Sequence, residues 1–316
     1  MNLILQMLIG WCVIAAIWLL VMPKDTRGKA WHYVHAAVPL IVLLVACGLS
    51  DGLLRDVLTV WATAGIFILL GLVATWAIGT ALRNHGIMDV AYPLLPFGAA
   101  CFMAYLFRAN FTWWSGLLLA MAAAWSLRLA FQTYHDNIGE ERQPYATWRK
   151  RGGNFWLWWS FFQIHVLQGV LIWIWSAPFA FAFGTPSPQM VWPAVLGVLV
   201  WLVGFLFQSF ADLQLRRFKE NPANRGGLLQ TGVWSVMRQP NYFGEAVMWW
   251  GYFVFALANP YGFLTIVCPA YVTWFMGYGS AGRFKEMHMS RTRPDVWAAY
   301  VARTPRFFPW PRPAGK

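Results

Sequence analysis

The sequence predicts an all-α protein, a polytopic integral membrane bundle of about seven to ten transmembrane helices. Its composition is the first reason. Hydrophobic residues make up 59% of the 316 residues and charged residues only 11%, whereas about a quarter is usual in soluble domains. The second reason is that apolar stretches such as 3–22 and 190–210 are long enough, as helices, to cross a hydrocarbon core of about 30 Å.

Nine apolar stretches follow one another along the chain and are the predicted spans. They are 3–22, 33–49, 57–80, 91–107, 112–131, 155–176, 190–210, 243–258 and 261–280. If the amino terminus lies outside, only Arg55 and Arg108 of the 24 basic residues fall in outer connections. This is the positive-inside distribution, so we expect an N-out, C-in topology. The net charge of +12 then reflects topology and anionic membrane lipid, and not nucleic acid.

The first stretch has no basic leader and no small-residue cleavage site, so we expect an anchor helix there and not a signal peptide. The four cysteines are spread through apolar spans and predict neither a disulfide framework nor a metal cluster. His32 and His35 would share a helix face, but no further ligands accompany them. We therefore predict no metal site.

A cationic face is predicted in the inner segment 211–242. Asp212, Arg216 and Lys219 follow the spacing i, i+4, i+7, which places them on one face of a helix that continues from 190–210. This pattern is typical of a salt bridge with snorkelling cations at a helix end. It also fits a site for phosphates, with Asp212 accepting from a ribose hydroxyl or orienting an arginine. Arg225 follows in "ENPANRGG", where proline and paired glycines end the helix.

The stretch "RQPNYFGE" places three polar residues at the mouth of an apolar helix. If that helix starts near Pro240, Asn241 and Glu245 lie one turn apart on one face, with Arg238 just before it. A carboxylate at this depth costs several kcal/mol unless it is paired or lines a cavity. A structural pair with a neighbouring arginine and the wall of a polar pocket are both open interpretations.

Other polar residues near predicted helix ends are less specific. Asp89 lies at the start of an apolar span that contains two prolines. It could be a charge at a helix N-terminus or an acid that faces a cavity. Arg128 lies near the inner end of 112–131, with Tyr134 beyond it. The sequence "EER" at 140–142 looks like a solvated charge run. In the basic tail, Arg283 and Glu286 are spaced i, i+3.

The stretch "LQTGVWSVMRQPNYFGEAVMWWGYF" resembles the carboxy-terminal signature of the steroid 5-alpha-reductase family, especially its bacterial branch, whose usual form is TG-(Leu)-W-x-x-x-RHPNYFGE. The stretches "DLQLRRFKENPANRGG", "EMHMSRTRPDVWAAYVARTPRFFPW" and "RGGNFWLWWSFFQIHVLQG" are similar to the same branch. The resemblance covers roughly residues 80–312. It implies amino-terminal transmembrane helices at 1–80 and a reductase domain at 81–316.

That resemblance implies a membrane-embedded reductase that takes NADPH from the inner side. Such enzymes transfer a hydride to a carbon–carbon double bond, typically one conjugated to a carbonyl, in a hydrophobic steroid-, isoprenoid- or lipid-like substrate. In the family, residues matching Asn241 and Glu245 help to form the cofactor pocket. The predicted cofactor-binding set is Arg128, Asp212, Arg216, Lys219, Arg225, Arg238, Asn241, Tyr242, Glu245, Arg283 and Glu286.

Hydride addition to an enone also requires an acid near the carbonyl oxygen. In steroid reductases a glutamate of an early helix and a tyrosine of a later helix hold that carbonyl. Asp89 is our candidate for the acid, but the position of the tyrosine falls on Trp125 here, so Tyr92 and Tyr134 are alternatives. Gln239 stands where the bacterial branch usually has histidine. The missing tyrosine argues against a 3-oxo-steroid as the substrate.

The main alternative function is a membrane methyltransferase of the isoprenylcysteine carboxyl methyltransferase type, which binds S-adenosylmethionine. Such enzymes share an R-H-P-x-Y-x-G block, but the fuller "NYFGE" block and the cationic segment 212–219 favour NADPH. A lipid-binding protein without chemistry is a third possibility, and a transporter is disfavoured because no inverted repeat is visible. We expect the chain in a bacterial inner (cytoplasmic) membrane, with the cofactor site facing the cytoplasm.

Overall fold

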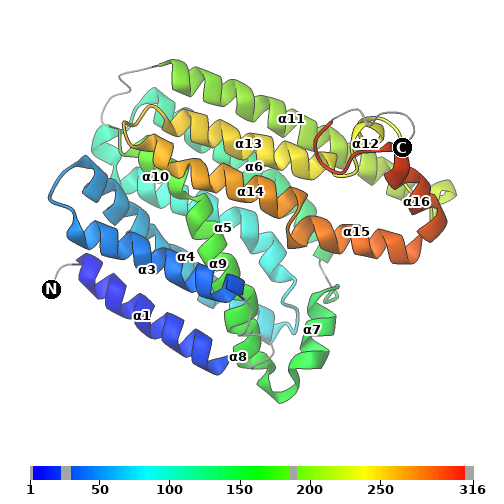
Figure 1. Cartoon of the computed structure of the whole chain (residues 1–316), viewed down its shortest axis with the longest axis horizontal. Helices are drawn as coiled ribbons and strands as arrows, with labels where there is room; N and C mark the ends of the chain where they lie inside the picture. Colours follow the sequence, from blue (N-terminus) through cyan, green and yellow to red (C-terminus); the bar gives the residue numbers. More distant parts are fainter. Residues whose placement is uncertain (1–2, 23–29, 138, 186–190, 310–316) are drawn as a thin grey trace. The chain divides into compact units, whose positions relative to one another are not determined.

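A computed structural model shows an all-helical chain and describes residues 3–22, 30–137, 139–185 and 191–309 (Figure 1). The predicted fold class is therefore confirmed. The chain forms two compact units, Met1–Pro188 and Gln189–Lys316. The division near residue 80 rests on the family resemblance and stays a prediction. The structural description below takes each unit by itself.

The first unit contains five of the predicted apolar stretches in order and most of a sixth as a series of short helices. Its elements are α1 (Leu3–Val21), α3 (Ala30–Gly48), α4 (Leu53–Ala81), α5 (Ile87–Leu106), η1 (Arg108–Asn110), α6 (Trp113–Asn137), α7 (Tyr145–Gly152), η2 (Gly153–Phe155), α8 (Trp156–Ser160), η3 (Phe161–Val166), α9 (Leu167–Trp175) and α10 (Ala177–Phe183). The stretch 155–176 is thus interrupted, and η3 is a π-helical turn. Such turns are rare and often occur at functional sites.

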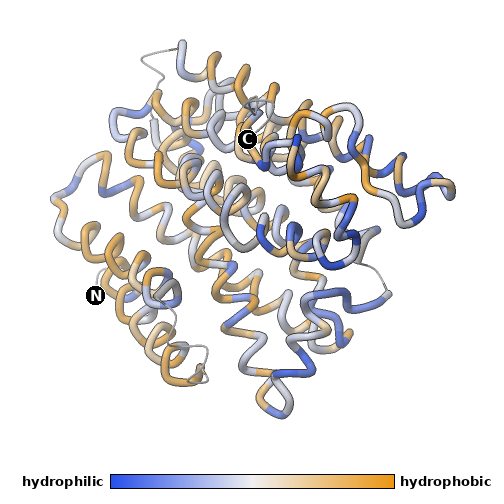
Figure 2. Tube along the Cα trace, turned by 45° about the vertical axis from the view of Figure 1, so that its right-hand side comes forward, coloured by the Kyte–Doolittle hydropathy of each residue, from blue (hydrophilic) through white to orange (hydrophobic). Residues whose placement is uncertain are grey.

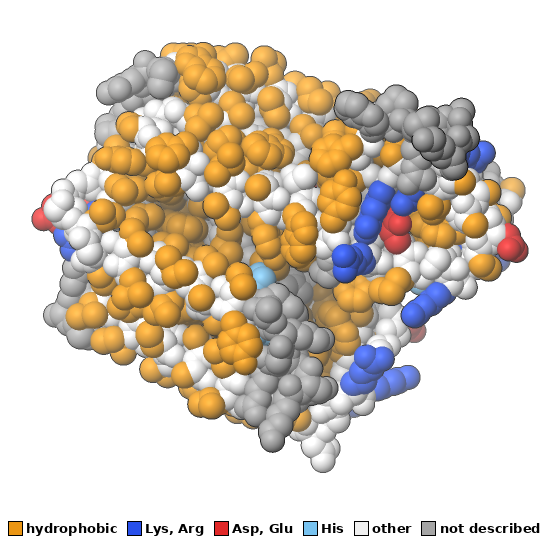
Figure 3. All heavy atoms as spheres, in the orientation of Figure 1, with side chains coloured by type: hydrophobic (Ala, Val, Ile, Leu, Met, Phe, Trp, Pro, Cys, Tyr) orange, Lys and Arg blue, Asp and Glu red, His pale blue; other side chains and the backbone are white. Residues whose placement is uncertain are grey.

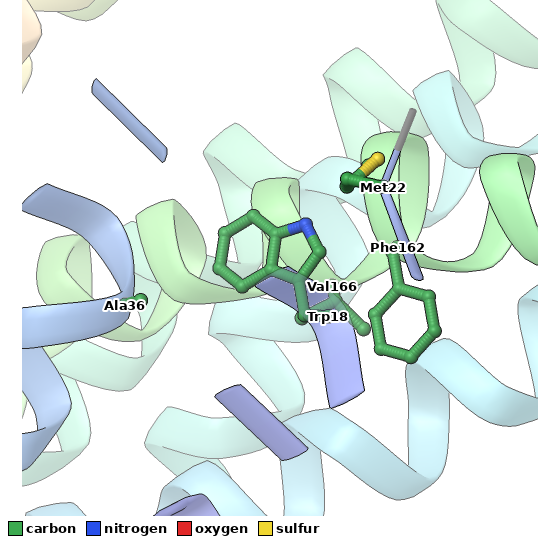
Figure 4. Packing of buried hydrophobic residues seen from close by; sticks show 5 residues of the cluster. All are labelled: Trp18, Met22, Ala36, Phe162 and Val166. Carbon is green, nitrogen blue, oxygen red and sulfur yellow. The ribbon is translucent and has the colours of Figure 1, made fainter. Parts of the chain in front are cut away.

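Buried side chains of α1, α3 and η3 form one hydrophobic cluster in this unit. Trp18 and Met22 from the end of α1 pack with Ala36 of α3 and with Phe162 and Val166 of η3 (Figure 4). The π-helical turn therefore contributes apolar residues to the core on this side. Its wider turn changes which residues of the segment face the neighbouring helices.

The second unit is built on two long antiparallel helices. Its elements are α11 (Trp192–Glu220), η4 (Pro222–Asn224), α12 (Val233–Val236), α13 (Pro240–Ala256), η5 (Gly262–Ile266), α14 (Val267–Gly277), α15 (Ser280–Thr292) and α16 (Pro294–Arg303). As expected, α11 continues past residue 210 and α13 starts at Pro240. The two helices run side by side (Figure 1).

Four glycines let the backbones of α11 and α13 approach closely. A Cβ on Gly204 would lie 2.6 Å from the Met248 nitrogen, and one on Gly244 would lie 2.6 Å from the Gln208 nitrogen. Gly197 and Gly251 form the same kind of contact two turns away, where a Cβ would lie 2.7 Å from the Phe255 nitrogen and 2.6 Å from the Trp201 nitrogen, respectively. Small residues at such seams are a usual device for packing membrane helices. This close approach also fixes the register in which polar residues of the two helices meet.

Six helical segments among the described residues are long and apolar enough to cross a membrane. They are Leu3–Val21, Leu53–Ala81, Ile87–Leu106, Trp113–His135, Tyr145–Phe183 and Trp192–Glu220. The apolar helix His32–Gly48 is shorter, and α13 and α14, which cover the last two predicted spans, have 17 and 11 residues. Large hydrophobic side chains on the spanning helices, such as Leu20, Leu70 and Val203, are exposed. The chain is an integral membrane protein.

Hydrophobic and hydrophilic residues are segregated along these helices. Figure 2 shows hydrophobic residues along the long helices and hydrophilic residues mainly near their ends and in the connections. In Figure 3, hydrophobic side chains cover most of the visible surface, and the largest group of Lys and Arg side chains in this view lies around α15. Exposed apolar surface of this extent requires lipid. The tail after residue 309 and most of the segment 23–32 lie outside the described residues.

Candidate functional site

A buried carboxylate is paired with two neutral donors where α11 meets α13. Gln208 Nε2 donates to Glu245 Oε2 over 2.6 Å, and Trp249 Nε1 donates to Glu245 Oε1 over 3.0 Å. Both Glu245 and Gln208 are buried. Gly204 and Gly244 make this contact possible, because any side chain there would hold the helices apart. These hydrogen bonds from an amide and an indole offset part of the cost of burying the carboxylate.

One turn along both helices lies a second polar pair. Asn241 Nδ2 donates to Asp212 Oδ1 over 3.2 Å, and the Asn241 side chain also accepts from the Tyr242 nitrogen over 3.1 Å. Both members of the pair are half-buried. The two pairs, Gln208–Glu245 and Asp212–Asn241, are together called the polar ladder. The first pair is buried and the second is partly exposed. Hydroxyls and amides of a ligand are the groups that such a ladder can bind.

Arg238 is committed to the protein itself. Its Nε and Nη2 each donate to a carboxylate oxygen of Glu286 over 3.0 Å, and its Nη1 donates to the Thr304 carbonyl over 2.6 Å. The guanidinium also lies over the Trp297 ring, 5.6 Å from its centroid. These contacts join the start of α13 to α15 and to the segment after α16. Two predicted cofactor residues, Arg238 and Glu286, therefore have a structural role.

Lys285 of α15 is a cation beside the ladder that sequence reasoning missed. Its Nζ lies 4.7 Å from the centroid of the Tyr242 ring and 5.1 Å from that of Trp234, and its side chain is half-buried. Burial lowers the pKa of Lys285 to about 8. Lys219 adds to the decrease, whereas Asp212 and Glu286 oppose it.

The remaining predicted cofactor residues are spread over the surface or lie in the other unit. Arg216 pairs with the exposed Glu220 of its own helix, Nε to Oε1, over 2.8 Å. Lys219, Arg225 and Arg283 are exposed. Arg128 is half-buried on α6 of the first unit. The structure thus gathers Asp212, Asn241, Tyr242 and Glu245 of the predicted set around the ladder.

In the first unit, the candidate acid Asp89 is hydrogen-bonded to a tyrosine. The buried Tyr145 hydroxyl, at the start of α7, donates to Asp89 Oδ1 over 2.6 Å, while Asp89 in the first turn of α5 is half-buried. Tyr134 is instead exposed near the end of α6, with its ring against His135. Tyr92 lies one turn after Asp89, and its ring meets Trp125 and Trp175 edge-on. Neither alternative named from sequence is the tyrosine bonded to Asp89.

The interpretation of 140–142 as a solvated charge run is wrong for Glu141. Its side chain is 9% exposed and accepts from Arg149 Nε over 2.6 Å, from Arg149 Nη2 over 2.9 Å and from the His85 backbone nitrogen over 2.8 Å. Burial acts to raise the pKa of Glu141, but the hydrogen bonds from Arg149 and His85 outweigh it, so the pKa is lowered. Burial, aided by Arg149, lowers the pKa of His85 to about 4. Glu141 therefore ties α7, and with it Tyr145, to the turn before α5.

No group of three or more His, Cys, Asp and Glu side chains in the described part of the chain could hold a metal ion. The polar ladder of the second unit and the Asp89–Tyr145 pair of the first unit each offer hydrogen bonds and charge to a ligand. The ladder offers amides and carboxylates with an ammonium beside it, and the Asp89–Tyr145 pair offers a carboxyl group hydrogen-bonded to a hydroxyl.

Comparison with known proteins gives two short similarities to sterol-modifying reductases. The chain is 26% identical over 158 residues to the Delta(14)-sterol reductase LBR of Gallus gallus, covering 43% of this chain and 23% of that protein. It is 38% identical over 65 residues to the steroid 5-alpha-reductase DET2 of Arabidopsis thaliana, covering 20% of this chain and 24% of that protein. The aligned parts thus span about a quarter of either relative. No solved structure matches the chain.

A family match covers most of the chain. Residues 75–304 match DUF1295, described as a protein of unknown function. This range includes the Asp89–Tyr145 pair, the polar ladder and Lys285, but not α1, α3 or the first part of α4. The chain therefore belongs to the DUF1295 family.

Proposed function

We propose that this chain is a membrane-embedded, NADPH-dependent reductase that acts on a carbon–carbon double bond conjugated to a carbonyl. The observation that carries the proposal is the polar ladder on α11 and α13 with a lysine beside it. An apolar helix pair retains carboxylates and amides, and an ammonium of α15 lies beside it, at a cost that a purely structural seam does not need to bear. The similarity to sterol and steroid reductases supports the same reaction class.

The second unit would hold the cofactor. The half-buried Asp212 and Asn241 would bind ribose or amide groups of the cofactor. The buried Gln208–Glu245 pair would hold α11 and α13 in register below them. Bound NADPH supplies a hydride to the substrate. The donors and acceptors of the ladder match the hydroxyl and carboxamide groups of a dinucleotide, and the cations match its phosphates.

Reduction of the enone also requires a proton. Reduction of an enone places negative charge on the carbonyl oxygen, and an acid held at that oxygen lowers the barrier. We assign Asp89 as this acid. Tyr145, which donates to one oxygen of its carboxyl group, is the positioning residue, and Tyr92 one turn away stays a sequence-based alternative. The substrate would be a hydrophobic steroid-, isoprenoid- or lipid-like enone, reached in the cytoplasmic membrane.

Binding of NADPH to the purified full-length protein in detergent tests the proposal. We expect saturable binding, measured by NADPH fluorescence, with competition by NADP⁺ and none by S-adenosylhomocysteine. Replacing Glu245 by Gln should weaken binding about tenfold or more, because hydrogen bonds to a charged group contribute about 1.5–3 kcal/mol. Asp295→Asn, on the exposed start of α16, is the matched control. A wild-type protein that binds S-adenosylhomocysteine but not NADPH would refute the reductase and favour the methyltransferase.

A further inference from the structure

Lys285 is held in place by aromatic faces and not by a carboxylate. Its Nζ lies near the rings of Tyr242 and Trp234, at 4.7 and 5.1 Å from their centroids. Trp234 is buried and fixed, since its Nε1 donates to the Ala211 carbonyl over 3.1 Å and its own carbonyl accepts from the Tyr300 hydroxyl. Aromatic faces attract a cation without neutralising it. The ammonium therefore has a defined position and keeps its charge available.

The carboxylates around Lys285 already have other partners. Glu286 accepts hydrogen bonds from Nε and Nη2 of Arg238, and Asp212 accepts one from Nδ2 of Asn241. Burial is the largest cause of the lowered pKa of Lys285, which is about 8. The cation Lys219 lowers this pKa further, whereas the carboxylates of Asp212 and Glu286 raise it. A partly desolvated ammonium on which a second cation acts is unfavourable unless an anion joins them.

We propose that Lys285, together with Lys219, binds a phosphate group of the dinucleotide, an assignment that rests on the proposed function. Ammonium groups are suited to this role because they act as point charges with several donors. Two of the arginines that the sequence offered already have carboxylate partners. Arg238 is bound to Glu286 and Thr304, and Arg216 is paired with Glu220.

The assignment predicts a particular dependence of binding on pH. A bound phosphate stabilises the protonated amine, so affinity is full at pH values where Lys285 carries its charge and falls as the pH rises above about 8. The charged groups that face Lys285 are Asp212, Lys219 and Glu286, with Arg238 behind Glu286.

The experiment compares NADPH titrations of the full-length protein in detergent at pH 7 and pH 9. We expect Lys285→Gln to weaken binding about tenfold at pH 7 and to remove most of the difference between the two pH values. Lys285→Arg should keep the affinity at pH 7 and also keep it at pH 9, because arginine stays charged. Arg291→Gln removes an exposed cation from the same helix and should leave both titrations unchanged.

A parallel titration with NADH identifies the phosphate. If Lys285→Gln weakens the binding of NADPH but not of NADH, Lys285 binds the 2′-phosphate. If the affinity for both dinucleotides falls equally, Lys285 binds the pyrophosphate. Unchanged binding in Lys285→Gln, with the wild type binding normally, overturns this inference and leaves the proposed function standing. A wild type that binds neither dinucleotide overturns the proposed function as well. Thermal unfolding of each variant shows whether it is folded.

Discussion

At the scale of single residues, two carboxylates inside this protein receive hydrogen bonds from neutral donors. Glu245 is bound by an amide and an indole, and Asp89 is bound by a phenol. Neutral donors stabilise a carboxylate without cancelling its charge.

The Asp89–Tyr145 pair carries the first prediction at this scale. With a hydrophobic enone that the wild type reduces, Asp89→Asn should lower kcat by about 100-fold or more, since a general acid contributes about 10²- to 10⁴-fold. Tyr145→Phe should lower kcat less and shift its pH profile, because the phenylalanine leaves Asp89 in place without its hydrogen bond. NADPH affinity should stay constant in both variants. The measurement is substrate-dependent NADPH oxidation from pH 5 to 9.

Tyr105→Phe, on an exposed position of α5, is the control for removal of a hydroxyl. The assignment fails if Tyr92→Phe or Tyr134→Phe abolishes reduction while Tyr145→Phe does not. Those two residues are the alternatives that the sequence offered. Comparing the three tyrosine variants therefore distinguishes a role of one hydroxyl in the reaction from a general loss of packing.

The sequence could indicate Asp89 as a candidate acid but not its hydrogen-bond partner. Asp89 was visible as a lone carboxylate in an apolar span, whereas Tyr145 is 56 residues away and follows a charged connection. Its spacing of four residues from Arg149 was a signal for a shared helix face, but it did not show which helix that face would meet. Lys285 was hidden for the same reason, because Trp234 and Tyr242 approach it only in the folded unit.

At the scale of elements, the glycine seam between α11 and α13 determines whether the ladder can form. The sequence predicted that α11 would continue through Asp212 and that α13 would start near Pro240, because helical spacing and proline position are local signals. The seam and the π-helical turn η3 were not predicted, because both depend on contacts between elements. Gly204 lies four residues before Gln208 and Gly244 lies one residue before Glu245, but the helix that each polar group would meet was unknown.

Substitution of a seam glycine should therefore affect stability and binding together. Gly204→Ala places a Cβ 2.6 Å from the Met248 nitrogen and 2.7 Å from the Gly244 carbonyl oxygen, so the helices must separate. We expect a decrease in thermal stability equivalent to about 1–3 kcal/mol, the usual cost of overpacking, and weaker NADPH binding as Gln208 moves away from Glu245. Thermal unfolding in detergent and the NADPH titration measure the two effects.

Gly10→Ala in α1 is the matched control, because nothing lies within 4 Å of a Cβ at that position. Alanine should be neutral or slightly stabilising there, since it favours the helix by about 0.5–1 kcal/mol over glycine. Equal shifts for the two variants would show that the seam is not close-packed. The contrast depends only on the surroundings of the glycine and not on the type of substitution.

At the scale of the whole molecule, composition was sufficient for the fold class and charge distribution for the expected topology. Both are sums over many residues, so errors at individual helix ends matter little. The apolar length of six segments confirms the membrane protein, whereas the placement of the two termini stays a prediction. The assignment of polar groups to two compact units was beyond the sequence, because it depends on which helices pack together.

The predicted N-out, C-in topology has a direct consequence for the proposed function. Lys219 and Lys285 belong to the predicted inner segments, so a phosphate site on them can be supplied only from the compartment that contains NADPH, the cytoplasm. Fused after residue 316 in a bacterial host, green fluorescent protein should fluoresce and alkaline phosphatase should be inactive. Inserted at the 3-residue turn η1 (Arg108–Asn110), a predicted outer connection, the two reporters should give the opposite result. An active phosphatase after residue 316 would place the lysines outside, and no cytoplasmic dinucleotide could then reach them.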